Sequence, residues 1–211
     1  MNRKIQVIRA PKRGAYDKST IYDILDSCFL CHVGFVHDKY PVVIPTLFGR
    51  KDDNIYIHGS SASRMVKDLS EGIDVCITVT RVDGLVLARS AYHHSMNYAS
   101  VVMFGKAQLV PDAEKEAALK VVSDHILDNR WEDCRLPNEK ELKATKVLSL
   151  KIDEASAKIR QGPPLDEKED YELSYWAGVV PIAQTYGQPI PDPLLNNAIK
   201  TPDYLPGNPH K

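Results

Sequence analysis

The sequence has almost no net charge and no block of charges of one sign. Its 27 Lys and Arg residues against 28 Asp and Glu residues leave a formal net charge of -1 at pH 7. Binding to nucleic acid or to anionic lipid relies on a surplus of basic residues, so neither partner is expected. The composition favours small molecules, or a second copy of the chain, as partners.

Long apolar segments are lacking too. No stretch of about 18 uninterrupted apolar residues occurs, so no membrane-spanning helix is expected. The basic segment 1–13 has no apolar run that could form the core of a signal peptide. Without an export signal, the four cysteines are expected to be free thiols in a reducing compartment. We therefore expect a cytoplasmic protein.

What the sequence contains is a series of short apolar segments separated by turns, and its 43% hydrophobic residues suffice for one core. Helices are predicted over residues 19–26 and 112–127, the second capped by Asp112. Many short strands with few helices indicate a small barrel rather than a parallel sheet. The predicted strands cover residues 29–36, 41–48, 55–58, 74–81, 84–88, 101–110, 147–152 and 157–160.

The chain divides into an N-terminal arm (1–18), a barrel domain (19–160) and a C-terminal extension (161–211). The extension holds nine of the 14 prolines. Because proline removes a backbone donor and fixes φ, this extension is predicted to lack regular structure. It is expected to wrap along the barrel or along a second copy.

The segment Cys28-Phe29-Leu30-Cys31-His32 formally matches the attachment motif of c-type haem. That attachment needs export, and in a strand two residues three apart point to opposite faces, so the two thiols would not act together. A zinc site needs a second cysteine pair at suitable spacing, which is lacking. Buried strand cysteines are the favoured interpretation.

The loop 59–64 (Gly-Ser-Ser-Ala-Ser-Arg) leads into a predicted helix. Small residues let backbone amides approach a ligand, and the Arg64 guanidinium suits a phosphate. Lys67 lies one turn further on and can add positive charge. The competing interpretation is a serine-capped helix with a solvated arginine. The Gly-Lys-Ser/Thr signature of a P-loop is missing.

Residues 89–100 form a polar segment before an apolar strand and include the adjacent His93 and His94. No carboxylate lies three or four residues from them, so ordinary histidines in a surface loop are favoured over a metal site. The density of Ser, Asn and Tyr is suited to hydrogen-bonding a heterocycle with polar edges.

In their order and spacing, several segments resemble the pyridoxamine 5'-phosphate oxidase-like flavoproteins, and more narrowly the branch that includes nitroimidazole-resistance proteins. The resemblance runs from about Ser19 to Pro181. The segments are 41–46 (Pro-Val-Val-Ile-Pro-Thr), 55–60 (Ile-Tyr-Ile-His-Gly-Ser), 63–64 (Ser-Arg), 94–98 (His-Ser-Met-Asn-Tyr), 100–102 (Ser-Val-Val) with Gly105, 157–164 and 176–181.

The resemblance implies a mainly β chain with a few helices, a six-stranded split β-barrel that forms a homodimer with FMN at the subunit interface. Ser63 and Arg64 match the family's phosphate-binding pair, although Met65 stands where the oxidases commonly carry lysine. The strand at residues 45–47 would lie along the isoalloxazine ring. Ala99 stands where arginine is frequent in the branch, which removes one polar contact.

Further contacts would come across the interface, from residues 97–100 of the partner chain and from Trp176 covering the cofactor. The expected cofactor-binding residues are Pro45, Thr46, Leu47, His58, Ser60, Ser61, Ser63, Arg64, Asn97, Tyr98, Ser100 and Trp176. No catalytic residue and no metal ligand is assigned.

The resemblance leaves the reaction open. The C-terminal residues 203–211 lack the basic signature of true pyridoxamine phosphate oxidases. The leading expectation is an FMN-dependent oxidoreductase that reduces nitroaromatics or quinones at flavin N5. One alternative is a flavin- or haem-binding module without turnover, with His58, His93 or His94 as axial ligand. Another is a deazaflavin-dependent enzyme on the same barrel.

Overall fold

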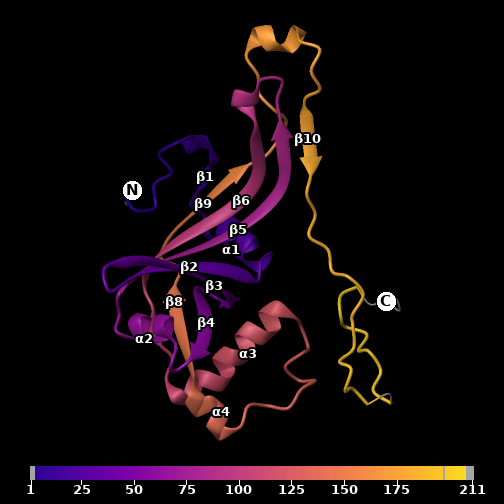
Figure 1. Cartoon of the computed structure of the whole chain (residues 1–211). Helices are drawn as coiled ribbons and strands as arrows, with labels where there is room; N and C mark the ends of the chain where they lie inside the picture. Colours follow the sequence, from indigo (N-terminus) through magenta and orange to yellow (C-terminus); the bar gives the residue numbers. More distant parts are fainter. Residues whose placement is uncertain (1–2, 197, 208–211) are drawn as a thin grey trace.

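Ten strands hydrogen-bond into one antiparallel sheet among residues 3–196 and 198–207, which this computed structural model describes (Figure 1). Their order is β1-β9-β6-β5-β2-β3-β4-β8-β7, and β10 pairs with β5 off this path. The strands are β1 (Gly14–Ala15), β2 (Leu30–His37), β3 (Tyr40–Lys51), β4 (Asn54–Ser60), β5 (Asp74–Leu87), β6 (Ser95–Lys106), β7 (Gln108–Leu109), β8 (Thr145–Lys151), β9 (Glu154–Arg160) and β10 (Gly178–Pro181). The helices are α1 (Lys18–Asp26), α2 (Arg64–Ser70), α3 (Lys115–Ile126) and α4 (Glu139–Ala144).

Local sequence explains how the first elements begin and turn. The Asp17 side chain accepts a hydrogen bond from the backbone N–H of Thr20 at 2.9 Å, so α1 begins at Lys18, one residue before its predicted start. The β2–β3 hairpin turns at Asp38 and Lys39, whose φ angles of 46° and 72° are those of a tight hairpin turn. The predicted hairpin is therefore confirmed.

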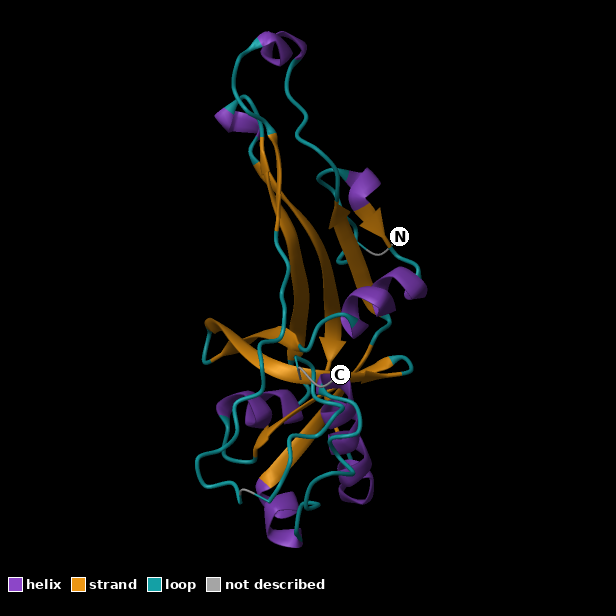
Figure 2. Ribbon diagram, turned by 90° about the vertical axis from the view of Figure 1, so that its right-hand side faces the viewer, coloured by secondary structure: helices purple, strands orange, loops and turns teal. Residues whose placement is uncertain are grey.

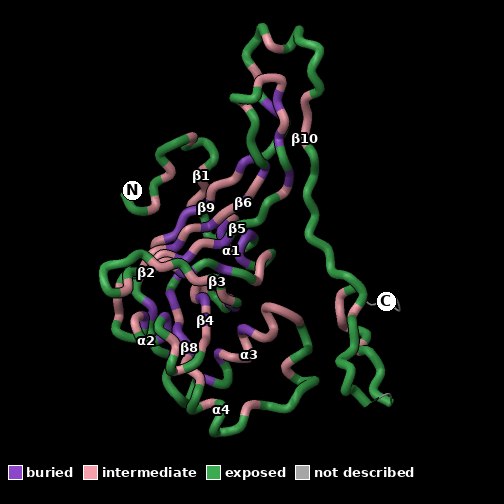
Figure 3. Tube along the Cα trace, in the orientation of Figure 1, coloured by how far each residue is buried: buried purple, intermediate pink, exposed green. Residues whose placement is uncertain are grey.

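The inner face of the sheet holds the core. Alternate residues of β5 and β6 are buried, as the alternating colours of Figure 3 show, and they pack with α1. Cys31 points into this core with none of its surface exposed. The predicted buried strand cysteine is thus confirmed at this position, whereas Cys28 is half-buried; all four cysteines are unpaired.

The outer face of the sheet is covered only in part. Helix α3 packs across β3 at Gly49, where a Cβ would lie 2.6 Å from the Val121 carbonyl oxygen, so this close approach requires glycine. Beyond Gly49, towards Leu47, the face opens. Figure 2 shows α1 against the sheet and α2, α3 and α4 gathered around the other half of the molecule.

The distal parts of β5 and β6 project from the body as an arm (Figure 1). The register of the pair shifts between Val82 and Gly84, and β10 pairs with β5 beyond this shift. The prediction of an irregular extension is wrong here, since residues 178–181 form β10 and residues 168–172 a 3-10 helix. Backbone pairing with an open strand edge overrides the local proline content, because three of the four β10 residues retain their N–H. Residues 208–211 of the extension lie outside the described part.

Other expectations need correction. Residues 74–81 and 84–87 belong to one strand, which ends before Ala88, and residues 95–100 lie in β6 rather than in a loop. Asp112 does not cap α3: it lies in a 3-10 turn, and its side chain pairs with Lys115 at 2.7 Å. The described residues form ten strands rather than six, because short strands extend the sheet at its edges.

Helix α4 was not predicted from the sequence. It begins with a capping box between Asn138 and Glu141. Every described helix is too short or too polar to cross a bilayer.

Candidate functional site

One row of side chains crosses six strands on the outer face of the sheet. Directly opposite residues of antiparallel neighbours point to the same face, and the pairs Leu30–Leu47, Thr80–Ser100 and Ser100–Lys158 define the row. The β3–β4 pairing ends at Phe48–Ile57 and the β2–β5 pairing at His32–Thr78. By alternation His58, one residue beyond the first pair, and Thr80, two residues beyond the second, lie on the same outer face. The row therefore consists of His58 (β4), Leu47 (β3), Leu30 (β2), Thr80 (β5), Ser100 (β6) and Lys158 (β9).

This outer face exposes apolar side chains. Leu30, Val43 and Leu47 keep 43%, 65% and 38% of their surface exposed although they lie in the middle of the sheet. Pro45 is exposed on the same face, whereas Thr46 points inward opposite Cys31. Thr46 can therefore reach a ligand on this face through its backbone alone. The arrangement is suited to a flat apolar ligand.

The loop at residues 59–64 lies between β4 and α2. Ser63 holds the N-cap position of α2, yet its hydroxyl makes no capping hydrogen bond, which departs from the serine-capped interpretation. The Ser60 hydroxyl accepts a hydrogen bond from the Ala62 N–H at 3.2 Å. Arg64 is exposed and forms no ion pair within the described residues. The Ser63 hydroxyl and the Arg64 guanidinium are therefore available to an anionic group.

His58 borders a cavity of about 400 Å³. The cavity is lined mainly by apolar side chains of α3, α4 and their connection, among them Leu119, Val122 and Trp131. The Nδ1 atom of His58 is buried and has no hydrogen-bond partner in the described part of the chain. Burial lowers the pKa of His58, so its imidazole is neutral at neutral pH. An unpartnered neutral imidazole beside an apolar cavity is a candidate ligand for a metal-containing group.

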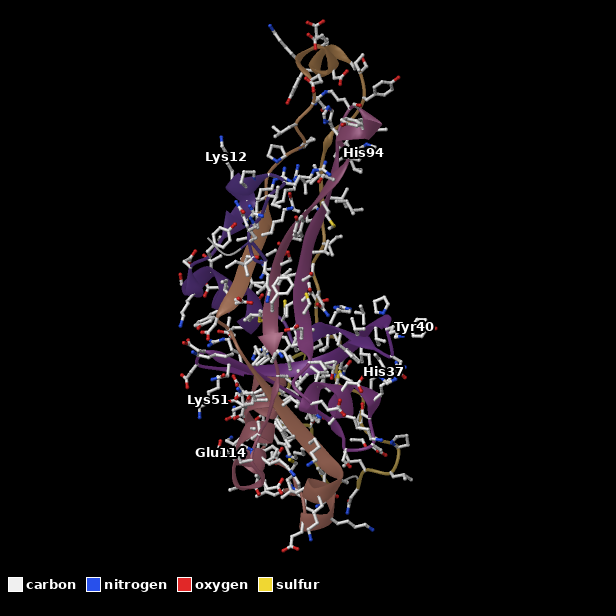
Figure 4. The ribbon with its side chains drawn as sticks, turned by 90° about the vertical axis from the view of Figure 1, so that its left-hand side faces the viewer. Lys12, His37, Tyr40, Lys51, His94 and Glu114 are labelled. Carbon is white, nitrogen blue, oxygen red and sulfur yellow. The ribbon has the colours of Figure 1, made fainter. Side chains whose placement is uncertain are left out.

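The other two candidate histidines lie elsewhere, at the tip of the arm. His93 Nε2 lies 3.6 Å from the Glu167 carboxylate, and His94 Nε2 lies 3.2 Å from the Ala88 carbonyl oxygen. In Figure 4, the labelled His94 lies on the arm, far from the labelled Lys51 at the end of β3. Of the three histidines, only His58 lines this cavity.

The residues expected to contact the cofactor from a partner chain do not gather around residues 45–47 of their own chain. Asn97 is buried, and its amide is engaged by Arg160 and by the Gly162 carbonyl oxygen. Tyr98 and Ser100 lie on the outer face of β6. Trp176 is 67% exposed and precedes β10, which runs along the arm (Figure 1).

Sequence reasoning missed two basic residues on this face. Lys158 ends the row, and Arg160 lies opposite Tyr98. Arg160 is 5% exposed, its guanidinium donates to the carbonyl oxygens of Gly162 and Pro163 at 2.9 and 3.1 Å, and its Nε is buried without a described partner. Burial and the nearby Arg13 lower the pKa of Arg160. The alternation of β9 could have placed Lys158 outward, but the Arg160 contacts depend on the turn that follows.

Comparison with known proteins places this geometry in a family. A family model described as pyridoxamine 5'-phosphate oxidase matches residues 17–159. A putative 5-nitroimidazole antibiotic resistance protein from Bacteroides thetaiotaomicron has 24% identity and a TM-score of 0.59, over 69% of this chain and 86% of that one, and shows the fold alone. The comparison with curated protein sequences found no match.

Two solved structures are similar over nearly the whole chain. The flavocytochrome Anf3 from Azotobacter vinelandii has 42% identity and a TM-score of 0.91, over 96% of this chain and 94% of that one. An FAD- and haem-binding protein from Mycobacterium smegmatis has 35% identity and a TM-score of 0.88, over 91% of this chain and 95% of that one. Close structural relatives of the chain are therefore flavin- and haem-binding proteins.

Proposed function

The chain belongs to the pyridoxamine 5'-phosphate oxidase family, and from that premise we propose that it is a redox protein that binds a flavin and a haem side by side. The observation that carries the proposal is the pair formed by the open apolar face at Leu47 and the cavity at His58. Both residues lie one position beyond the last β3–β4 pair, Phe48–Ile57, and alternation places them on the same face of these neighbouring strands.

The flavin is assigned to the outer face. Pro45 and Leu47 supply an apolar surface for the ring, and the backbone of β3 supplies hydrogen-bonding groups. Ser63 and Arg64 are available for the phosphate, since neither side chain is engaged within the described chain. These residues fit a flavin by their chemistry: an apolar platform beside a cationic, hydroxyl-bearing loop.

The haem is assigned to the cavity beside His58. A neutral imidazole with an unpartnered nitrogen among the described residues fits an axial ligand, and the apolar walls fit a porphyrin. When bound, the flavin supplies hydride and one-electron transfer and the haem iron supplies one-electron transfer. The chain itself holds the two groups close together, excludes water from the cavity and keeps His58 unprotonated.

A second copy of the chain completes the flavin site in this proposal. Leu47 and Ser100 are three strand spacings apart on the open face, roughly 14 Å, so one flavin ring does not reach both within one chain. A homodimer through the open face brings residues 97–100 and Trp176 of the partner towards the flavin, and covers the exposed leucines and valine.

The proposal extends to the identity of the flavin and to the reaction. FMN is the flavin that the sequence resemblance implies, whereas the relative from M. smegmatis is described as binding FAD. Reduction of nitroaromatics or quinones at flavin N5 is the expected reaction of the flavin. A flavin- and haem-binding module without such turnover is the second candidate, and the buried Nδ1 of His58, which has no partner in the described chain, favours it.

An absorbance spectrum of the purified full-length chain tests the proposal. We expect flavin bands in the blue together with a Soret band, and mass spectrometry after heat release distinguishes FAD from FMN. His58→Ala is expected to lose the Soret band and keep the flavin, whereas His94→Ala keeps both. Turnover of a quinone with reduced nicotinamide then tests the reductase.

Two results would contradict parts of the proposal. No chromophore, even after addition of flavin and haemin, would overturn the function as a whole. An unchanged Soret band in His58→Ala would remove His58 as the haem ligand and leave the flavin assignment standing.

A further inference from the structure

The connection between α3 and α4, residues 127–138, forms one wall of the His58 cavity. Trp131 and Pro137 from this connection line the cavity, opposite Leu119 and Val122 of α3. Ion pairs from Lys120 to Glu132 and from Arg135 to Glu141 hold the connection to the two helices. Trp131 is half-buried and lines the cavity. An outward movement of the connection would therefore carry Trp131 away from the cavity and open it.

A tyrosine of the C-terminal extension (161–211, below also called the tail) forms hydrogen bonds with residues on both sides of Trp131 in the chain. Tyr204 accepts a hydrogen bond from Arg130 Nη1 at 3.2 Å and donates one to Asp133 Oδ2 at 2.6 Å. Arg130 Nη1 and Asp133 Oδ2 are themselves 3.5 Å apart. One phenol oxygen thus bridges the residues on either side of the cavity-lining tryptophan.

The C-terminal extension also lies beside the end of α3, with a cavity between them. Tyr186, Leu205 and Pro206 of the tail, with Ile126 and Leu127, line a second apolar cavity of about 330 Å³. Ile126 belongs to the lining of both this cavity and the His58 cavity. The C-terminal extension therefore contacts the connection that carries Trp131 and borders, across this cavity, the end of α3.

From these contacts we propose that Tyr204 is a positioning residue. Its hydrogen bonds to Arg130 and Asp133, here called the latch, hold the α3–α4 connection in place so that Trp131 closes the His58 cavity. The inference rests on the proposed function only for the identity of the occupant, which is haem. The latch itself is a property of the polypeptide and needs no cofactor. Loss of the latch lets the connection move outward, which exposes Trp131 and speeds the release of the occupant.

Fluorescence quenching of Trp131 tests the latch without any cofactor. The chain has two tryptophans, so a Trp176→Phe background makes Trp131 the sole reporter. In that background Tyr204→Phe, which removes the phenol oxygen alone, is expected to raise the acrylamide quenching constant about two-fold or more. Tyr175→Phe is the matched control, because Tyr175 is exposed beside the arm. Equal quenching constants with and without the Tyr204→Phe substitution would overturn the latch.

Haem loss measures the consequence in the otherwise unaltered chain. After loading with haemin, Tyr204→Phe is expected to transfer haem to an excess of apomyoglobin roughly 3- to 10-fold faster than the parent, the factor that one or two lost hydrogen bonds produce. Equal rates for the parent and the Tyr204→Phe variant would overturn the role in retention. A parent chain that binds no haem contradicts the proposed function, and the quenching experiment still decides the latch.

Discussion

Arg160 donates a hydrogen bond to the side-chain oxygen of Asn97, and the two residues are 5% and 9% exposed. The same guanidinium donates to the carbonyl oxygens of Gly162 and Pro163. These contacts join β6 to the turn where the chain leaves β9 and enters the extension. A residue that sequence reasoning assigned to cofactor binding, Asn97, is thereby engaged within its own chain.

Replacing Arg160 tests this junction. Arg160→Met is expected to lower the free energy of unfolding by about 2–4 kcal/mol, because the buried Asn97 oxygen and two partly buried carbonyl oxygens lose their donor. Lys158→Met, two residues earlier on the same face and half-buried, is expected to change it by less than about 0.5 kcal/mol. Urea denaturation of both variants measures the difference. Similar values for the two would show that the Arg160 contacts contribute little.

The phosphate contact of the flavin depends on Arg64. Arg64→Ala is expected to weaken flavin binding by about 1.5–3 kcal/mol, or roughly 10- to 150-fold, because a charged hydrogen bond is lost. Lys51→Ala, at the end of β3, is the control and should bind flavin normally. Titration of the apoprotein with FMN and with FAD, followed by flavin fluorescence, gives the dissociation constants. An unchanged constant would place the phosphate elsewhere.

His58 makes the stability of the apoprotein depend on pH. Burial disfavours its charged form, so its pKa in the folded chain lies below its ordinary value. The unfolded chain takes up a proton below about pH 6.5 that the folded chain does not, so unfolding becomes easier as the pH falls towards the folded pKa. The stabilising contribution is therefore complete above about pH 6.5.

Replacing the imidazole removes this contribution. The free energy of unfolding of the parent apoprotein is expected to fall more between pH 7.5 and pH 5.5 than that of His58→Phe. Denaturant titrations at the two pH values measure both differences, and His94→Phe serves as the control for an exposed histidine. Parallel pH profiles for the parent and His58→Phe would contradict the burial of a neutral His58.

The open apolar face is expected to form the dimer interface. Val43→Asp introduces a charge at the centre of this face and is expected to shift the chain from dimer to monomer, with a weaker association by 10-fold or more, since an unpaired charge is costly to bury. Leu136→Asp, on the α3–α4 connection, is a control with a similarly exposed side chain. Light scattering after size exclusion measures the mass. A monomeric parent that holds flavin would refute the shared site.

Much of the fold was predictable because its signals are local. The alternation in β2, the turn at Asp38 and Lys39 and the polar segment before α1 each act within a few residues. The same local signals identified the loop at residues 59–64 as a candidate anion site. They failed for β10, where pairing with an edge some ninety residues earlier in the chain decides the structure.

The sequence by itself determined the positions of most of the long strands, that Cys31 lies in a core, and that the chain resembles flavoproteins. Only the tertiary structure decided which side chains meet. Strand order and register place His58 and Leu47 on one face, just beyond the last β3–β4 pair, and continue the row to Lys158; helices from residues 115–144 build the cavity beside His58. The physical reason is that alternation sets the face on which a side chain lies, whereas register and helix packing, which depend on residues distant in the chain, set its neighbours.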